Sequence, residues 1–408
     1  MRAYVRKVLL MVTKSSAPLS GVRVLDLSNV LSGPYCCYQL ALLGAEVIKV
    51  ERPISGDLAR QLGSDAERNK NNMGISFLAQ NAGKKSITLD LKSPEGKSLL
   101  KKLVSKADVL VENFRPGVMD RLGLGYETLK IHNKNLVYCA ITGFGQTGPW
   151  VDKPAYDQII QGVSGMMSIT GDAASAPLRV GYPLADTAGG MTAAFSITAA
   201  LNAEARGAFI DISMTEAVIS NMGWVVSNHL IGDVTPSAHG NENTTSAPSG
   251  TFRCSDSPIN IAANKDEQWA LLAIHLNRED LLTHSDYKTR EDRKRNRVAL
   301  RAEIESVLIK RPAHKWVEEL SAISVPVGPI YSVPEILQQE QILSRDLIAT
   351  YDDYADKISV VASPALFDDV RPRASHPSAQ LGEHNEEVYQ SLGVTSDELD
   401  ELKDKNII

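Results

Sequence analysis

Asp186 is the only acid in the stretch Tyr182–Met191, which reads YPLADTAGGM, and Gly189 and Gly190 follow it closely. Two interpretations of this carboxylate are open. Aspartate is a favoured N-cap, so a helix can begin here. An aspartate can also act as a nucleophile in covalent catalysis. Taken alone the stretch favours the N-cap, and the rest of the sequence has to decide between the two.

Cations and an aromatic residue follow the ends of three predicted strands. Arg52 comes directly after EVIKVE, Lys92 comes just past SITLDL, and Asn113–Gly117 (NFRPG) follows DVLVE. Parallel α/β sheets bind ligands at the carboxyl ends of their strands. These positions suit a phosphate-rich ligand that contains a purine, although a cluster of surface charges explains them equally well.

Other kinds of site find no support in the sequence. The turn SNVLSGP holds a single glycine, Gly33, and lacks the G-x-G-x-x-G pattern of dinucleotide-binding turns. There is no Walker loop and no G-x-S-x-G elbow, and the eight histidines lack zinc-site spacing. The four cysteines form no CxxC pair and are expected to be reduced thiols in the core. We therefore expect no metal and no permanently bound cofactor.

The bulk composition is that of a globular protein with two or three domains. The chain has 408 residues, of which 43% are hydrophobic and 23% charged, and its formal net charge is -6. This balance argues against a nucleic-acid partner, and no run of about 18 apolar residues could span a membrane. The basic first segment has no acid before Asp26 and offers Met11 as an alternative start. It predicts a ragged cytoplasmic N-terminus, with a short mitochondrial presequence, and hence the mitochondrial matrix, as the alternative.

Two strand–helix–strand units are predicted in the first part of the chain. The first has a strand over 22–27, a helix over 35–45 and a strand over 46–51. The second has a strand over 86–91, a helix that opens at Ser93-Pro94-Glu95, and a strand over 108–114. A further strand covers 136–145. Such units pair parallel strands through crossover helices, so we predict an open α/β sheet.

The second part of the chain has a different composition. A helix is predicted over 187–205, and from about Val234 the sequence becomes polar and rich in turns. We predict four regions: an N-terminal extension over 1–20, a large domain over 21–224, a small α+β domain over 225–335, and a C-terminal segment over 336–408.

Many segments, in order, resemble the class III CoA-transferases. They include GVRVLDLSNVLSGPYCCYQLALLGAEVIKVERPISGD, NAGKKSITLDLKSPEGK, ADVLVENFRPGVMDRLGLGYE, ITGFGQTGP, AYDQIIQGVSGMMSITG, GYPLADTAGGM and LGEHNEEV. The resemblance runs from about Gly21 to Leu392. It implies a large Rossmann-like domain with a parallel sheet, a smaller α+β domain, and a C-terminal segment that returns to the large domain. It also implies that two chains interlock as a homodimer.

The resemblance also implies roles for particular residues. Asp186 matches the family's nucleophilic aspartate, and coenzyme A or an acyl-CoA is a substrate rather than a bound cofactor. The residues that match the family's CoA pocket are Asn29, Val30, Leu31, Ser32, Arg52, Leu89, Lys92, Asn113, Phe114 and Arg121.

Two departures from the family pattern bear on the reaction. The segment NENTTSAPSG (241–250) stands where some transferases carry a glycine-rich loop. The related α-methylacyl-CoA racemases have a histidine before an aspartate where this chain has Tyr156-Asp157. A phenol with a pKa near 10 is a poor base at neutral pH, which favours a transferase over a racemase.

We therefore expect CoA transfer from an acyl-CoA, with succinyl-CoA favoured, to a small carboxylic acid, with a dicarboxylate favoured. A helix N-terminus is expected to keep Asp186 ionised. Tyr156, Asp157, Gly189 and Gly190 are candidate supporting residues, the glycines because they allow close approach of backbone donors. Arg179 and Thr244–Ser246 are candidates for contacting a second carboxylate. A racemase or epimerase, a formyl-CoA/oxalate-type transferase and a carnitine-type transferase stay as alternatives.

Overall fold

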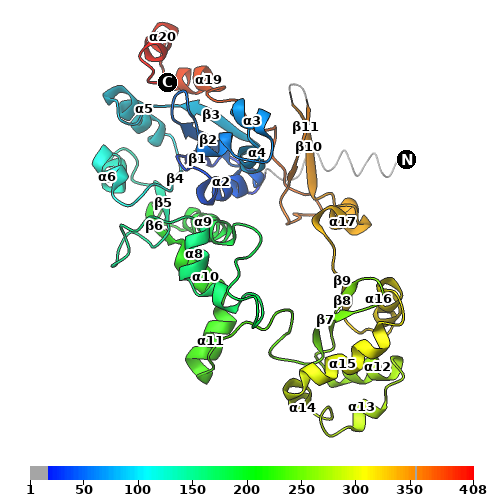
Figure 1. Ribbon diagram of the computed structural model, residues 1–408. Coiled ribbons are helices and arrows are strands. Elements are labelled where there is room, and N and C mark those ends of the chain that lie inside the picture. Colours follow the sequence, from blue (N-terminus) through cyan, green and yellow to red (C-terminus); the bar gives the residue numbers. More distant parts are fainter. Residues whose placement is uncertain (1–16, 354–355) are drawn as a thin grey trace. The chain divides into compact units, whose positions relative to one another are not determined.

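The computed structural model describes residues 17–353 and 356–408 (Figure 1), so most of the predicted N-terminal extension lies outside the described residues. The chain divides into two compact units. The larger contains the described residues up to Met166, Val180–Gly232 and Ser344–Ile408; the smaller contains Met167–Arg179 and Asp233–Leu343. The larger unit extends to residue 232, past the predicted boundary at 224. The reason is that α11 (Gly223–Gly232), which follows α10 (Met214–Asn221), belongs to the larger unit.

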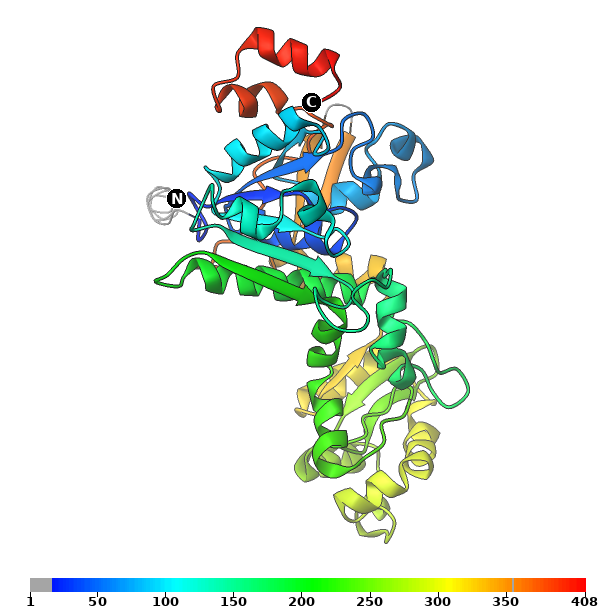
Figure 2. The same cartoon turned by 90° about the vertical axis from the view of Figure 1, so that its left-hand side faces the viewer.

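A six-stranded parallel sheet forms the centre of the larger unit. Its strands are β1 (Arg23–Asp26), β2 (Glu46–Glu51), β3 (Lys84–Thr88), β4 (Val109–Glu112), β5 (Val137–Thr142) and β6 (Ala208–Ser213). The order is β3-β2-β1-β4-β5-β6, and the arrows run in a common direction in Figure 2. The order reverses between β1 and β4, and ligands of doubly wound sheets bind at such a point. The predicted α/β sheet is confirmed.

Helices cover both faces of this sheet, because its central strands are apolar on both sides. One face packs against α2 (Ser32–Leu42), α8 (Asp157–Val163), α9 (Leu184–Leu201) and α10. The other packs against α5 (Pro94–Val104), α6 (Val118–Leu122), α7 (Tyr126–Leu129), α19 (Asn385–Gln390) and α20 (Ser396–Asp404). The buried Tyr389 of α19 donates a hydrogen bond to the carbonyl of Thr88 at 2.6 Å, which ties the C-terminal segment to β3.

The larger unit also has short elements beside the sheet. They are the 3-10 helix η1 (Leu58–Gln61), α3 (Ala66–Lys70), α4 (Ile75–Asn81), and the antiparallel pair β10 (Ile348–Asp353) and β11 (Asp356–Val361). A small apolar cluster joins α2, α4 and this pair of strands. No helix of the described chain is long and apolar enough to cross a membrane.

The smaller unit is an α+β domain with its own core. Its antiparallel sheet is β7 (Ser249–Arg253), β8 (Pro258–Ala262) and β9 (Val327–Pro329). Its helices are η2 (Met166–Ile169), which begins at the boundary, α12 (Asp266–His275), α13 (Asp280–Thr283), α14 (Arg290–Arg295), α15 (Arg297–Leu308), α16 (Ala313–Ala322), α17 (Val333–Leu337) and α18 (Glu340–Ser344), which ends at it. Trp269 and Trp316 are buried between this sheet and its helices. The segment Met167–Arg179 joins this unit, where the Gly240 N–H donates to the carbonyl of Gly171 at 2.6 Å.

The strand ends differ from the prediction in a way that matters for the site. β3 ends at Thr88 and β4 at Glu112, whereas the predicted strands ran to 91 and 114. Leu89, Lys92 and Asn113–Phe114 therefore lie in loops past the strand ends. The predicted cap of α5 is confirmed, because the Ser93 hydroxyl accepts a hydrogen bond from the Gly96 N–H at 2.9 Å and Pro94 begins the helix.

Candidate active site

Asp186 lies in the first turn of α9, but it is not the N-cap. The helix begins at Leu184 with Pro183 in the N-cap position, and no side chain caps it from there. The N-cap interpretation is therefore wrong. Because Asp186 lies inside the helix, its part-buried side chain projects sideways from the first turn, into a cavity.

Asp157 of α8 supports the start of α9 instead. Its carboxylate accepts hydrogen bonds from the Ala185 N–H at 2.8 Å and from the Gln161 side-chain amide at 2.7 Å. Gln161 also donates to the carbonyl of Tyr182 and accepts from the Val180 N–H. The two side chains thus fix the loop that leads into Asp186.

The pKa of Asp186 is raised to about 7. Burial is the larger cause, and the negative charge of Asp157 adds to it. We expected the helix N-terminus to keep Asp186 ionised. A position in the first turn does favour an anion, but burial and Asp157 outweigh it. Near neutral pH both forms of this carboxyl are therefore populated in the free protein.

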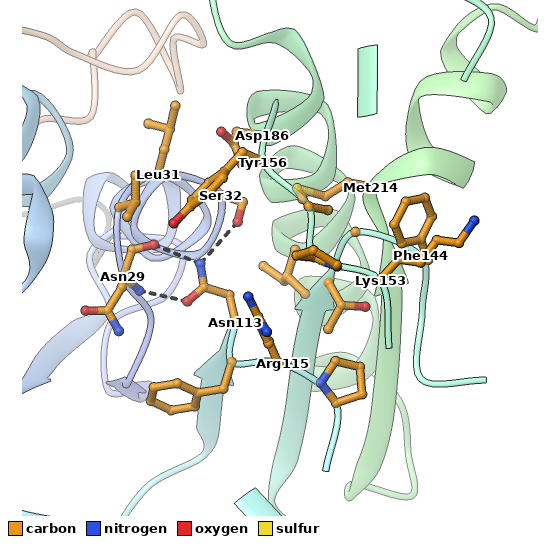
Figure 3. Close-up of a pocket in the computed structure, with 18 of the residues that line it drawn as sticks. Asn29, Leu31, Ser32, Asn113, Arg115, Phe144, Lys153, Tyr156, Asp186 and Met214 are labelled. Atoms are coloured by element: carbon orange, nitrogen blue, oxygen red, sulfur yellow. Dashed lines mark hydrogen bonds between the residues drawn. The ribbon is translucent and has the colours of Figure 1, made fainter. Parts of the chain in front are cut away.

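The first cavity, of about 250 Å³, contains Asp186. It lies at the carboxyl ends of β4 and β5 and is bounded by the starts of α2, α9 and α10 and by Tyr156, the residue before α8. Tyr156, Leu31 and Ser32 line this cavity together with Asp186 (Figure 3). The cavity lies at the reversal of strand order, where a ligand is expected.

A second cavity, of about 390 Å³, lies at the carboxyl ends of β2 and β3. Arg52 and Lys92 supply two positive charges, and Leu89 supplies part of an apolar wall. Asn29 and Phe114 line both cavities. The two spaces are therefore neighbours, and a long ligand could occupy both.

Asn113 fixes the loop that separates these cavities. Its side chain accepts from the Asn29 N–H at 2.8 Å and donates to the Asn29 carbonyl at 2.8 Å and to the Ser32 hydroxyl at 3.3 Å (Figure 3). One asparagine just past the end of β4 thus binds both the backbone N–H and the backbone carbonyl of Asn29 in the β1–α2 loop.

The structure brings together most of the residues expected at the site. The first cavity is lined by Asn29, Val30, Leu31, Ser32, Asn113, Phe114, Tyr156 and Asp186. The second is lined by Asn29, Arg52, Leu89, Lys92 and Phe114. Arg121 lines neither; it is exposed on α6, whose Val118 and Leu122 line the second cavity.

Gly189 and Gly190 have a different setting from the expected one. Both are buried inside α9, where backbone N–H groups belong to the helix itself. A Cβ on Gly190 would lie 2.4 Å from the Ser32 carbonyl oxygen, and one on Gly189 would lie 2.8 Å from Met214 Cγ. The glycines therefore let α2 and α10 pack close to α9, and this packing places Ser32 and Met214 at the cavity.

The candidates for contacting a second carboxylate belong to the other unit. Arg179 and Thr244–Ser246 lie in the smaller unit, as does the segment 241–250. The cations that line the first cavity are Arg115 and Lys153. Arg115 belongs to the segment NFRPG, which the sequence placed at a strand end. Lys153 was missed, although it lies close to the motif ITGFGQTGP. Met214 gave no signal, because only the packing of α10 against α9 brings it to the cavity.

Comparison with other proteins identifies the family. The family model for CoA-transferase family III matches residues 19–385, so the chain belongs to that family. This confirms the resemblance seen in the sequence.

Characterised relatives and a solved structure match nearly the whole chain. A succinate–glutarate CoA-transferase of Agrobacterium fabrum is 35% identical over 92% of this chain and 96% of its own. An acetyl-CoA:oxalate CoA-transferase of Acetobacter aceti is 37% identical over 82% of this chain and 86% of its own. The crystal structure of a CAIB/BAIF family protein from Brucella suis matches with a TM-score of 0.81 and 33% identity, over 93% of this chain and all of that one.

Replacing Asp186 with asparagine should stabilise the protein at high pH. The raised pKa means that the folded state holds a proton which the unfolded chain releases between about pH 4 and pH 7, so wild type loses stability across that range. We expect Asp186→Asn to unfold with a free energy about 2 kcal/mol above wild type at pH 8, with the difference shrinking towards pH 4.

Urea unfolding at both pH values measures this difference. Asp397→Asn, at an exposed first-turn aspartate of α20, is the matched control and should change stability by less than ~0.5 kcal/mol at either pH. An Asp186→Asn protein no more stable than wild type at pH 8 would contradict the raised pKa.

Proposed function

We propose that this CoA-transferase moves CoA from an acyl-CoA, with succinyl-CoA as the expected donor, to a small dicarboxylic acid through a covalent intermediate on Asp186. The observation that carries the proposal is the placement of Asp186 in a cavity that shares two wall residues with a second, cation-lined cavity. The Agrobacterium relative is named for glutarate and the Acetobacter relative for oxalate, and both of these acids are dicarboxylates.

The second cavity is the proposed site for the nucleotide part of CoA. Arg52 and Lys92 would bind its phosphates, and Leu89 would contact its apolar parts. The pantetheine arm would pass between Asn29 and Phe114, which line both cavities, and bring the sulfur to Asp186. Arg121, on the outer side of α6, stays a predicted CoA contact.

The proposed chemistry is two acyl exchanges. The Asp186 carboxylate attacks the thioester carbonyl, the C–S bond breaks, and a mixed anhydride forms while CoA leaves as a thiolate. The thiolate attacks the Asp186 carbonyl carbon, which releases the donor acid as a carboxylate and leaves an aspartyl-CoA thioester. The acceptor carboxylate repeats the steps in reverse, so the thioester's free energy is conserved.

The raised pKa of Asp186 fits a nucleophile. A carboxylate with a pKa near 7 is more basic than an ordinary aspartate, and it attacks a carbonyl better once it has lost its proton. Tyr156 lines the same cavity, and we propose its hydroxyl as a hydrogen-bond donor to the thioester oxygen. Asp157 acts on Asp186 through its charge and through the start of α9.

The first cavity favours a small acid with a second negative charge. Its volume of about 250 Å³ lies below the usual range for drug-sized ligands. Arg115 and Lys153 are both exposed and able to meet a carboxylate. The positive charges of Arg115 and Lys153 would also repel a carnitine-type acceptor, which carries a cation, so such an acceptor is less favoured.

A racemase remains the alternative from a different class. Among the described residues that line the first cavity there is no histidine, and Tyr156 precedes Asp157 where racemases have one. Exchange of the substrate α-hydrogen with deuterium from solvent, in the absence of an acceptor acid, would favour the racemase. A formyl-CoA/oxalate-type transferase differs only in its acids and is distinguished by the same assay as the main proposal.

We further propose that the larger unit is a Rossmann-like domain and that the protein works as a homodimer. Large apolar side chains are exposed on two helices of this unit that both contact α10: Phe195 of α9 is 73% exposed, and Trp224 and Ile231 of α11 are 75% and 87% exposed. Exposed apolar patches of this kind mark protein interfaces. The cytoplasmic location, with the mitochondrial matrix as its alternative, stays a prediction.

A transfer assay tests the reaction class and identifies the acceptor. Purified protein is incubated with succinyl-CoA and a pooled panel of mono- and dicarboxylic acids, and new CoA thioesters are detected by mass. We expect a new CoA thioester of a dicarboxylic acid. For Asp186→Asn we expect the rate of CoA transfer to fall at least about 1,000-fold, because an amide cannot form the anhydride. Transfer by Asp186→Asn near the wild-type rate would exclude the nucleophile assignment.

The pH dependence of the reaction should follow the ionisation of the Asp186 carboxyl. We expect kcat/KM for the acyl-CoA to rise with pH to a plateau, with an apparent pKa near 7, because only the ionised carboxylate attacks. Asp157→Asn removes the neighbouring charge and should move this rise to lower pH. Asp152→Asn, at an exposed residue of the preceding loop, should leave the profile in place. An unchanged profile in Asp157→Asn would show that Asp157 does not act on Asp186.

Lys153 should affect dicarboxylates selectively. We expect Lys153→Gln to raise KM for glutarate about tenfold, the effect of losing one charge-assisted contact, and to change KM for valerate less than twofold. Lys134→Gln, at an exposed lysine outside both cavities, should alter neither value. Equal effects on the two acids would remove Lys153 from the acceptor site.

A further inference from the structure

The β1–α2 loop, which lines both cavities, contains a residue in an unfavourable backbone conformation. Val30, between β1 and α2, has a φ of +66°. A β-branched residue rarely adopts this left-handed region, because its side chain crowds the backbone. Such a conformation persists only where the surrounding structure holds it.

Asp57 supplies the contact that holds Val30. The Val30 N–H donates a hydrogen bond to Asp57 Oδ1 at 2.9 Å. The same oxygen accepts the Ala59 N–H at 2.9 Å, which caps η1. Asp57 is fully buried and lines neither of the two cavities.

Asp57 is itself held in place by the end of β2. Its N–H donates to Glu51 Oε2 at 3.1 Å, and Glu51 forms a buried, two-point ion pair with Arg60 at 2.6 and 2.8 Å. The backbone of Asp57 is therefore fixed independently of the loop that its side chain binds.

A buried lysine joins Asp57 to the start of the same loop. Lys49 Nζ lies 2.9 Å from Asp57 Oδ2 and donates to the carbonyl of Ser28 at 2.9 Å. Burial would raise the pKa of Asp57, but the charge of Lys49 and the N–H groups of Val30 and Ala59 outweigh burial and lower it. The acceptor of the Val30 N–H is thus an anion, and hydrogen bonds to anions are the stronger kind.

We propose that Asp57 is a positioning residue of the transfer site, which holds Val30 in its left-handed conformation and so keeps the segment Asn29–Ser32 against both cavities. The proposal rests on the proposed function and deepens it. Asp57 touches no substrate in this arrangement. Its effect on turnover passes through the backbone of Val30. Because a valine needs support to keep a positive φ, loss of Asp57 should change the position of this loop and hence the rate of transfer.

A double-mutant cycle tests this link. Glycine adopts positive φ without strain, so Val30→Gly removes the need for Asp57 to hold this conformation. We expect Asp57→Asn, which keeps the size of the side chain but loses its charge, to lower kcat/KM about tenfold alone. In the Val30→Gly background the same substitution should lower kcat/KM less than threefold. Equal losses in the two backgrounds would overturn the proposal.

Asp65→Asn is the matched control. Asp65 also caps a helix in this segment, accepting the N–H groups of Glu67 and Arg68 at 3.0 Å, but it does not touch the loop. Its replacement should change kcat/KM less than twofold in either Val30 background. Thermal unfolding of every variant separates a folding defect from a change at the site.

Hydrogen exchange tests the contact without relying on activity. In wild type, the Val30 amide should exchange about as slowly as the amides of β1, because its acceptor is buried. In Asp57→Asn it should exchange at least tenfold faster while β1 is unchanged. Fast exchange in wild type would overturn the proposal even if Asp57→Asn failed to fold. If wild type transferred no CoA, the proposed function would fail while this measurement still decided the role of Asp57.

Discussion

Two buried aspartates and two buried lysines support the β1–α2 loop, which lines both cavities. Asp26 and Lys49 lie on adjacent strands, Lys84 lies on the next, and Asp57 follows β2; all four are almost completely buried. Burial alone would raise the pKa of Asp26, but the charges of Lys49 and Lys84 lower it to about 2. Two positive and two negative charges thus balance under the β1–α2 loop, where an unpaired charge would cost several kcal/mol.

Buried charged side chains differ from an apolar core because they form directional hydrogen bonds with nearby backbone groups. Lys49 binds the Ser28 carbonyl, Asp26 accepts the Ser28 N–H at 3.0 Å, and Lys84 binds the Pro34 carbonyl at 2.8 Å. The first two bonds fix the peptide groups on either side of Ser28 in the β1–α2 loop, and the third fixes a peptide group in the first turn of α2. Apolar side chains of equal volume could stabilise the fold as well, but they would not hold these peptides in one orientation.

The carboxylate of Asp186 has a different electrostatic environment. Asp26 and Asp57 are buried beside cations, which keep their pKa values low, whereas Asp186 is part-buried beside Asp157, and its pKa is raised to about 7. The same residue type therefore serves as a permanent anion under the loop and as a basic carboxylate in the cavity. The difference lies in the partner that each fold position provides.

The sequence by itself determined the parallel sheet and the residues at its strand ends, because strand periodicity and capping residues are local properties. It led to Asp186 as a candidate nucleophile only through the order of its motifs, which resembles that of a known family. It could not determine that Asp186 lies within the first turn of α9, that Asp157 raises its pKa, or that Gly189 and Gly190 serve helix packing. Those facts depend on where α8 and α10 pack against α9. Asp57 shows the same limit, since only the tertiary structure brings its carboxylate to the N–H of Val30, 27 residues away in the chain.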